Sequence, residues 1–190
     1  DLSDRLETYL QQMENENLLK KRTLPQTDAS PLLCYYSKTL YFDEKNSADM
    51  FIDLCRDVEV NYSRVEKWLV SYNGKQEFSL SVEQTAAVTG LVSHGCGILT
   101  GGPGCGKTTT TKTLVNLLLA MGKTVLLAAP TGRAAQRMEE VVGHEAKTIH
   151  RLLEFQNGSF KRNREYPLAT DVLVIDECSM LDISLTAALL

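Results

Sequence analysis

The chain has 190 residues, which is enough for one domain of ordinary size and a smaller one. Its 43% hydrophobic and 23% charged residues describe a soluble globular protein, and no apolar run reaches the ~20 residues that a membrane span requires. The net charge of −4 neither favours nor excludes a nucleic-acid partner, because such binding depends on a local basic groove.

The start of the chain and its cysteines indicate where the protein works. The first residues contain no basic region followed by an apolar one, so we expect no signal peptide. The five cysteines are an odd number without a Cys-x-x-Cys pair, which disfavours a disulfide framework or a zinc site. We therefore expect reduced thiols in a cytoplasmic protein. Because residue 1 is Asp rather than Met, we also expect a piece of a longer protein.

Residues 1–75 predict a small, mainly helical domain, and none of them carries an evident chemical motif. Trp68 and the tyrosines could stack on bases, but aromatic clusters mostly bury area, so packing is the favoured interpretation. The predicted elements are a helix over 1–22, two short strands over 32–36 and 39–42, a helix over 43–58 and another around Trp68.

From Phe78 onward helical and strand patterns alternate, so residues 76–190 predict an α/β domain. The strands are continuous apolar runs, which is typical of a parallel sheet covered on both faces. We expect helices over 81–93, 109–120, 133–142 and 148–153, strands over 97–100, 124–129 and 171–175, and a basic, polar loop over 157–166.

The stretch from Gly101 to Thr108 fits the phosphate-binding pattern G-x-x-x-x-G-K-[ST]. Its glycines allow positive φ angles and bring backbone N–H groups close to a phosphate. Lys107 supplies a charge for the β- and γ-phosphates, and the Thr108 hydroxyl can ligate Mg²⁺. The predicted strand before the loop and the helix after it give the context that the motif needs, with the helix N-terminus facing the anion.

Asp176 and Glu177 follow the last predicted strand and indicate the reaction type. A carboxylate at the carboxyl end of a strand beside the phosphate loop can hold Mg²⁺, here Asp176. A second carboxylate, Glu177, can orient or deprotonate an attacking water. The alternative is that both acids only cap the next helix. That alternative leaves two acids without a positive partner, so the pair favours an ATPase over a phosphate-loop kinase.

Gln84 admits two interpretations. Its amide presents one donor and one acceptor, which can match the edge of adenine. Ser81 and Gln84 also have the spacing of a capping box, in which Gln84 only accepts from the Ser81 N–H. The sequence leaves both open.

Two further segments suggest contact with a nucleic acid. Pro130, Thr131 and Arg133 follow the second strand, where hydroxyl, N–H and guanidinium groups could meet a phosphate backbone. His150 begins another helix and could bind a phosphate or stack on a base. An isolated histidine is more often structural, and Arg133 could simply cap or pair within its own helix.

Together these segments resemble the first motor domain of superfamily 1 helicases, most closely the RecD-type helicases of the 5′-to-3′ branch, including the exodeoxyribonuclease V alpha subunit. The resemblance runs through residues 80–84, 101–108, 129–135, 148–153 and 174–180 and covers about residues 32–190. It implies a RecA-like fold, ATP as substrate with Mg²⁺, single-stranded DNA as partner, and no membrane.

The resemblance also implies site residues. Lys107, Asp176 and Glu177 would be catalytic, Thr108 and Asp176 would hold Mg²⁺, and Pro130, Thr131, Arg133 and His150 would bind DNA. The ATP contacts would be Gln84, Gly102, Pro103, Gly104, Cys105, Gly106, Lys107, Thr108 and Thr109.

The family also uses a second motor domain that contributes an arginine finger, and the chain stops before any such domain. We expect that C-terminal domain, and recombination or repair subunits, to be partners. The isolated chain would then hydrolyse no ATP and, with an incomplete sheet, would associate with another copy or be marginally stable.

Two rival classes stay open. One is another 5′-to-3′ motor, such as a Pif1-like helicase or a conjugative relaxase-helicase. The other is a nucleotide-binding module that does not hydrolyse ATP. The residues after Leu190 would distinguish the motors, and turnover with and without single-stranded DNA would identify the module.

Overall fold

The computed structural model describes residues 2–27, 29–76 and 79–190, so Phe78, where the alternation of helices and strands is expected to begin, lies outside the described residues. The chain divides into two compact units. The first contains residues 1–50 and 182–188, and the second contains residues 51–181. Among the described residues, no helix is both long and apolar enough to cross a membrane.

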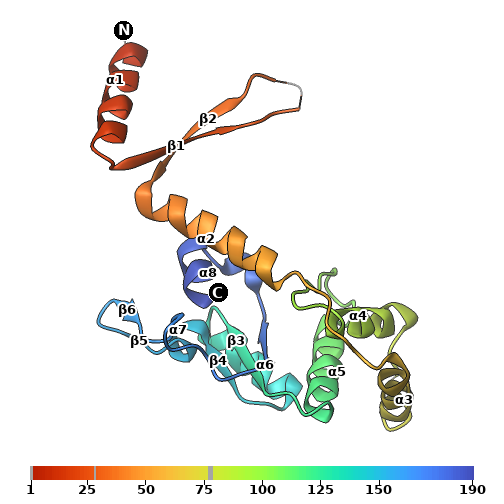
Figure 1. Ribbon diagram of the computed structural model, residues 1–190. Helices are drawn as coiled ribbons and strands as arrows, with labels where there is room; N and C mark the ends of the chain where they lie inside the picture. The colour runs from red at the N-terminus through yellow and green to blue at the C-terminus, as the bar shows by residue number, and fades with distance from the viewer. Residues whose placement is uncertain (1, 28, 77–78) are drawn as a thin grey trace. The chain divides into compact units, whose positions relative to one another are not determined.

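The first unit combines helices with a β-hairpin (Figure 1). Strands β1 and β2 pair antiparallel, with Leu19 opposite Ser37 and Leu24 opposite Leu32. The Arg22 guanidinium contacts the Glu44 carboxylate at 3.1 Å, which connects the hairpin to the following helix. The elements are α1 (Leu2–Asn15), β1 (Leu19–Leu24), β2 (Leu32–Ser37), α2 (Lys38–Leu54) and α8 (Ile183–Leu189).

Two predictions for this unit are wrong, and local hydrogen bonds explain both. The helix expected over 1–22 ends at Asn15, because Asn17 takes a left-handed conformation with φ 58°. Its N–H donates to Glu14 O and the Leu18 N–H to Met13 O, which together form a Schellman cap. The strand expected over 39–42 is the start of α2, where the Ser37 hydroxyl accepts from the Leu40 N–H.

The second unit contains a parallel α/β sheet, which confirms the predicted fold class. Its strand order is β4-β3-β7, and β3 pairs parallel with both neighbours. The expected strands over 124–129 and 171–175 form as β3 and β7. The elements are α3 (Tyr62–Asn73), α4 (Val82–Val92), α5 (Lys107–Ala120), β3 (Val125–Ala129), α6 (Gly132–Val142), β4 (Ala146–Thr148), α7 (Ile149–Leu152), β5 (Phe155–Gln156), β6 (Ser159–Phe160), β7 (Val172–Ile175) and the short 3₁₀ helix η1 (Cys178–Met180).

The core of this unit joins the helices to the sheet. Trp68 packs against it and stacks on Tyr72 with ring centroids 4.7 Å apart, so packing is the role that the structure gives Trp68. The Tyr72 hydroxyl in turn accepts from the Asn116 amide of α5 at 3.2 Å. The buried residues of the main core cluster are Val65, Leu69, Val88, Val92, Val115, Leu117, Leu118, Val125, Leu127, Met138 and Val142.

The strand predicted over 97–100 does not form. These residues have no strand structure, and the side chain of Ile98 is 89% exposed. The residues just before them pair elsewhere, because His94 bridges antiparallel to Asp57 in the segment that follows α2. A short apolar run in a sequence indicates that its residues favour burial, but it does not say which strand they pair with. Here the described sheet ends at β7, and residues 97–100 add no strand to it.

The core makes a testable prediction within one helix. Val88 of α4 is 0% exposed and Val82 is 82% exposed. We expect Val88→Ala to lower the free energy of unfolding by about 2 kcal/mol, because it removes two buried methyl groups and leaves a cavity. Val82→Ala should change it by less than about 0.5 kcal/mol. Urea denaturation of both variants measures the difference, and equal effects would contradict this description of the core.

Candidate nucleotide and DNA sites

The phosphate-binding loop leads into the start of α5. Gly104 and Gly106 have φ angles of 78° and 73°, in the left-handed region that favours glycine. Gly106 is the N-cap of α5, and no side chain caps this helix. The N–H groups of the first turn therefore have no side-chain acceptor.

Other helices of the chain begin differently. A side-chain oxygen accepts from a first-turn N–H at the starts of α3, α4, α6, α7 and α8, through Asn61, Ser81, Thr131, Thr148 and Asp182 respectively. The start of α5 thus keeps the free N–H groups and the positive dipole end that bind an anion.

Lys107 lies beside this helix start. Its ammonium donates to the carbonyl oxygens of Gly101 at 2.6 Å and Gly102 at 2.8 Å, which folds the loop over it. An ammonium has three donors, so one remains for a ligand. Thr108 and Thr109 are exposed at the same end of the helix, whereas the Thr110 hydroxyl donates to Gly106 O.

Gln84 caps α4 and contacts the loop. Its side-chain oxygen accepts from the Ser81 N–H at 2.9 Å, and the Ser81 hydroxyl accepts from the Gln84 N–H, which completes the capping box. Its amide nitrogen donates to Cys105 O in the loop at 3.2 Å. The amide therefore lies at the phosphate loop with both of its polar groups hydrogen-bonded.

The paired acids follow β7. The Asp176 N–H donates to Ala128 O at 3.0 Å, so the strand pairing extends to this residue, and the Asp176 carboxylate accepts from the Glu177 N–H at 2.9 Å. Glu177 is exposed and has φ 53°, which is uncommon outside glycine. Partial burial and then the Asp176 charge raise the pKa of the Cys178 thiol, so this neighbour stays neutral.

The sheet register brings three predicted segments to one edge. Ala129 of β3 pairs with Thr148 of β4, and Ala128 pairs with Ile175 of β7. Parallel strands end at the same edge, so Thr131, His150 and Asp176 all follow the carboxyl ends of neighbouring strands.

The predicted DNA contacts differ in how they are held. Pro130 and Thr131 are half-buried, and the Thr131 hydroxyl accepts from the Ala134 N–H at 3.2 Å to cap α6. Arg133 and His150 are exposed. Thr131 therefore has a structural task besides any contact with a ligand.

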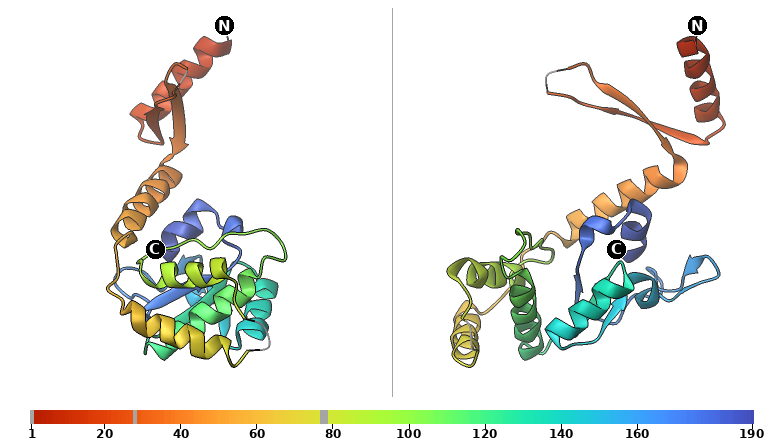
Figure 2. Two further views of the ribbon diagram at one scale, coloured as in Figure 1. Left: turned by 90° about the vertical axis from the view of Figure 1, so that its right-hand side faces the viewer. Right: turned by 180° about the vertical axis from the view of Figure 1, so that it is seen from behind.

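His150 belongs to an aromatic cluster that the sequence analysis missed. Its ring lies 5.4 Å from that of Phe155 and 5.6 Å from that of Phe160, measured between centroids. The two phenylalanines are opposite each other in the β5–β6 hairpin, which extends away from the sheet (Figure 2). Asn157 and Gly158 both have positive φ, as a type I′ turn requires. The Asn157-Gly158 pair was the sequence signal for this hairpin turn. The expectation of a loop over 157–166 is wrong at its start, where Ser159–Phe160 form β6.

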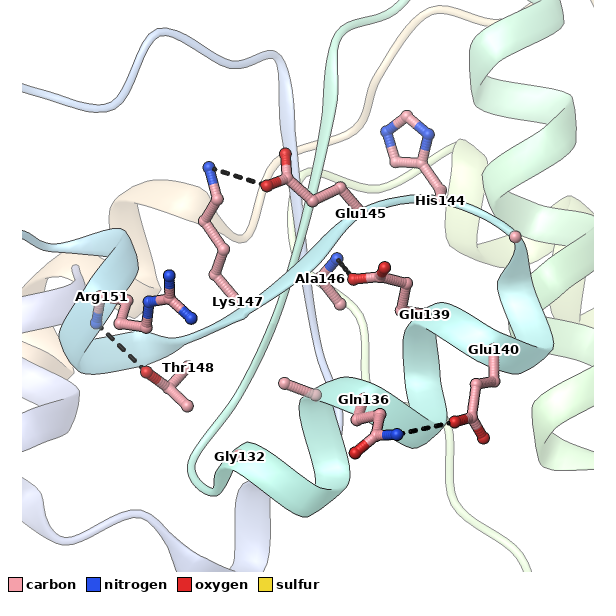
Figure 3. Close-up of a pocket in the computed structure, with 12 residues that line it drawn as sticks. Gly132, Gln136, Glu139, Glu140, His144, Glu145, Ala146, Lys147, Thr148 and Arg151 are labelled. Atoms are coloured by element: carbon pink, nitrogen blue, oxygen red, sulfur yellow. Dashed lines mark hydrogen bonds and ion pairs between the residues drawn. The ribbon is translucent and has the colours of Figure 1, made fainter.

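A hollow of about 660 Å³ lies between α6 and β4 (Figure 3). The Glu139 carboxylate accepts from the Ala146 N–H at 3.1 Å and holds the two elements together. Lys147 is paired with Glu145 at 3.4 Å. Because three glutamates line the hollow with Lys147 and Arg151, it offers no excess of positive charge for a phosphate.

The structure does not bring all the predicted residues together. Among the described residues, no hydrogen bond or ion pair joins the phosphate loop to Asp176 or Glu177, and no group of His, Cys, Asp and Glu is arranged to hold a metal ion. The loop forms one site with Gln84. The acids and the DNA candidates share the sheet edge.

Comparison with known proteins identifies the family of the chain. A profile of the family described as AAA domain matches residues 84–190. The ATP-dependent RecD2 DNA helicase of Deinococcus radiodurans is 38% identical over 147 residues, which are 77% of this chain and 20% of that protein. The RecBCD enzyme subunit RecD of Mycolicibacterium smegmatis is 40% identical over 57% of this chain and 24% of that protein. The ATP-dependent DNA helicase dda of Enterobacteria phage T4 is 37% identical over 48% of this chain and 23% of that protein.

These relatives confirm the resemblance to RecD-type helicases. The chain spans about a fifth to a quarter of the length of each of them.

The loop geometry predicts that Gly106 tolerates no side chain. A Cβ there would clash with the Gln84 amide nitrogen, and its φ of 73° strains any other residue by about 1–2 kcal/mol. Gly106→Ala should therefore lower both stability and nucleotide affinity. Gly132→Ala, at the start of α6 with no atom within 4 Å, is the matched control and should change neither.

Thermal unfolding and titration with a fluorescent ATP analogue measure the two effects. Adding Gln84→Ala to Gly106→Ala should recover the part due to the clash and leave the part due to backbone strain. A fully stable, fully binding Gly106→Ala protein would contradict the loop conformation.

Proposed function

The chain belongs to the AAA-domain family, and from that premise we propose that it is the ATP-binding part of a DNA helicase that moves 5′-to-3′ along single-stranded DNA and unwinds duplexes. The observation that carries the proposal is the uncapped start of α5 behind Gly106, with Lys107 beside it. Five other helices close this position with their own side chains, and the phosphate loop leaves it open for an anion.

ATP would bind with its phosphates at this helix start. The third donor of Lys107 would meet the β- and γ-phosphates, and the loop N–H groups would meet the remaining oxygens. Thr108 and Asp176 supply exposed hydroxyl and carboxylate oxygens, the ligand type that Mg²⁺ prefers, so the donor set fits this ion. Bound Mg²⁺ would neutralise charge on the phosphates.

Glu177 would orient and deprotonate the attacking water. Its carboxylate is exposed and its backbone has a left-handed conformation, which is a feature found at functional sites and worth testing as one. The Asp176 carboxylate fixes the Glu177 N–H at 2.9 Å and so helps to position this residue.

Single-stranded DNA would follow the carboxyl edge of the sheet. His150 is exposed and its ring is braced by Phe155 and Phe160, which prepares it for stacking on a base. Arg133 and the N–H groups after Pro130 would contact phosphates, which binds DNA without reading its sequence.

A second motor domain would complete the helicase, and subunits for recombination or repair would be its partners. The relatives named RecBCD enzyme subunit RecD support the idea of partner subunits. A non-hydrolysing nucleotide module is the second candidate, favoured by one observation. Lys107 is bound to two loop carbonyls, and in the described part of the chain no hydrogen bond or ion pair joins it to the acids, which suits binding more than turnover.

We predict distinct effects for the two charged residues. Lys107→Ala should weaken ATP binding to the chain about 10- to 100-fold, because a charge-assisted hydrogen bond is lost. Glu177→Gln should leave ATP affinity within about twofold and, in the whole protein, lower turnover by about 10²-fold or more, because the water loses its base. Equilibrium titration and steady-state ATPase assays with single-stranded DNA measure both.

Wild-type turnover in the Glu177→Gln protein would show that Glu177 is not the base that acts on the water. If the wild-type whole protein binds ATP but does not hydrolyse it with DNA present, the second candidate holds instead.

We also predict that His150→Ala weakens binding of single-stranded DNA by about 1–3 kcal/mol, equally for different sequences, because one stacking contact is lost. Nucleotide affinity should not change. His94→Ala, an exposed histidine away from the sheet edge, is the control. Thr131 should be tested as Ser, since Ala would also remove the cap of α6. Fluorescence anisotropy showing unchanged DNA affinity in His150→Ala would take His150 out of the DNA path.

A further inference from the structure

Two chain segments that are distant in sequence pair just ahead of the phosphate loop. Asp57, after α2, and His94, after α4, form an antiparallel bridge. The Gly95 N–H donates to Arg56 O and the Val58 N–H donates to Ser93 O, both at 2.8 Å. These two bonds flank the bridge, which makes Asp57 and His94 a non-hydrogen-bonded pair.

Cys55 and Cys96 each lie two residues from the bridge, on the same side of it. The Gly95–Arg56 bond joins the residue before Cys96 to the residue after Cys55, so the two cysteines lie on neighbouring segments. It is the last bond of the pairing, because the Arg56 N–H donates to Leu54 O in its own segment. The approach is close, because a Cβ on Gly95 would clash with Leu54 O.

The two thiols interact directly. Cys96 is half-buried, and this burial, followed by the interaction with the Cys55 thiol, raises the pKa of Cys96. Cys55 is exposed, so it meets a solute first. Within the described part of the chain these cysteines belong to no metal-binding group, which leaves a dithiol.

We propose that Cys55 and Cys96 are a redox-modification site, a dithiol that closes reversibly to a disulfide ahead of the phosphate loop. The oxidant is a low-molecular-weight disulfide. The Cys55 thiolate attacks one of its sulfurs, forms a mixed disulfide and releases one small thiol. Cys96 then loses its proton and attacks the Cys55 sulfur, releasing the second thiol. Two electrons pass to the small disulfide, and the two protein thiols become one S–S bond.

The bond would restrain the entrance of the phosphate loop. Cys96 precedes Gly101 by only the unpaired residues 97–100, so the disulfide fixes one end of this stretch to the end of α2. It also closes a loop of about 40 residues, which should raise the melting temperature by roughly 5–10 °C. The inference depends on the pairing of these segments and stands whether or not the chain belongs to an active helicase.

The test is oxidation of the purified chain with glutathione disulfide, followed by thiol titration and peptide mapping. Free thiols should fall from five to three, with a new crosslink between residues 46–56 and 76–107 that dithiothreitol reverses. The second tryptic peptide also contains Cys105, so Cys105→Ser should keep the crosslink while Cys96→Ser and Cys55→Ser abolish it. Cys34→Ser, in the first unit, is the control and should keep the crosslink.

Oxidation in urea provides the comparison for geometry. The folded chain should give the Cys55–Cys96 crosslink alone, and the unfolded chain a mixture of pairings. The proposal is overturned if the crosslink disappears in Cys105→Ser, if folded and unfolded chains give the same mixture, or if five thiols persist after oxidation. Slower amide exchange in residues 97–100 of the oxidised chain would locate the restraint.

Discussion

The free N–H groups at the start of α5 are the feature on which the rest of the site depends. A helix start without a side-chain cap is unfavourable by itself, since its first amides lack acceptors. The helix forms because Val115 and Leu117 are buried in the core of the second unit. Burial on one part of the helix thus maintains an unsatisfied, positive end on another, and a phosphate is the group that completes it.

The same dependence explains the position of Gln84. Its capping box fixes the start of α4, and its amide nitrogen donates to Cys105 O in the loop. Glycine at 106 permits this contact, because any side chain there would meet the Gln84 amide. The loop is therefore shaped from α4 as well as from its own glycines. The Gln84 amide keeps a second N–H and a second lone pair on its oxygen, so these two bonds do not exhaust its capacity for a ligand.

The sequence predicted the parts of the fold that local signals control. Residues 124–129 and 171–175 are apolar runs between polar turns and became β3 and β7, and the spacing of Ser81 and Gln84 became a cap. The strand expected over 32–36 forms as β2, but its partner β1 was missed, because Lys20, Lys21 and Arg22 show no alternation of apolar and polar residues. The prediction of a strand over 97–100 was wrong, because a short apolar run becomes a strand only if a partner strand pairs with it, and the sequence does not show which strands pair. The sequence singled out His150 as a candidate, but it did not identify the aromatic neighbours, although Asn157-Gly158 is a strong hairpin signal.

The stretch over 97–100 and the outer edge of β7 both lack a pairing partner among the described strands. Among the described strands β7 pairs on one side only, with β3, so its other edge presents free backbone groups. Residues 97–100 are an apolar run that pairs with no described strand, and they lead directly into the phosphate loop. A restraint on Cys96, just before that stretch, would act on the entrance of the loop rather than on Lys107, Asp176 or Glu177 themselves.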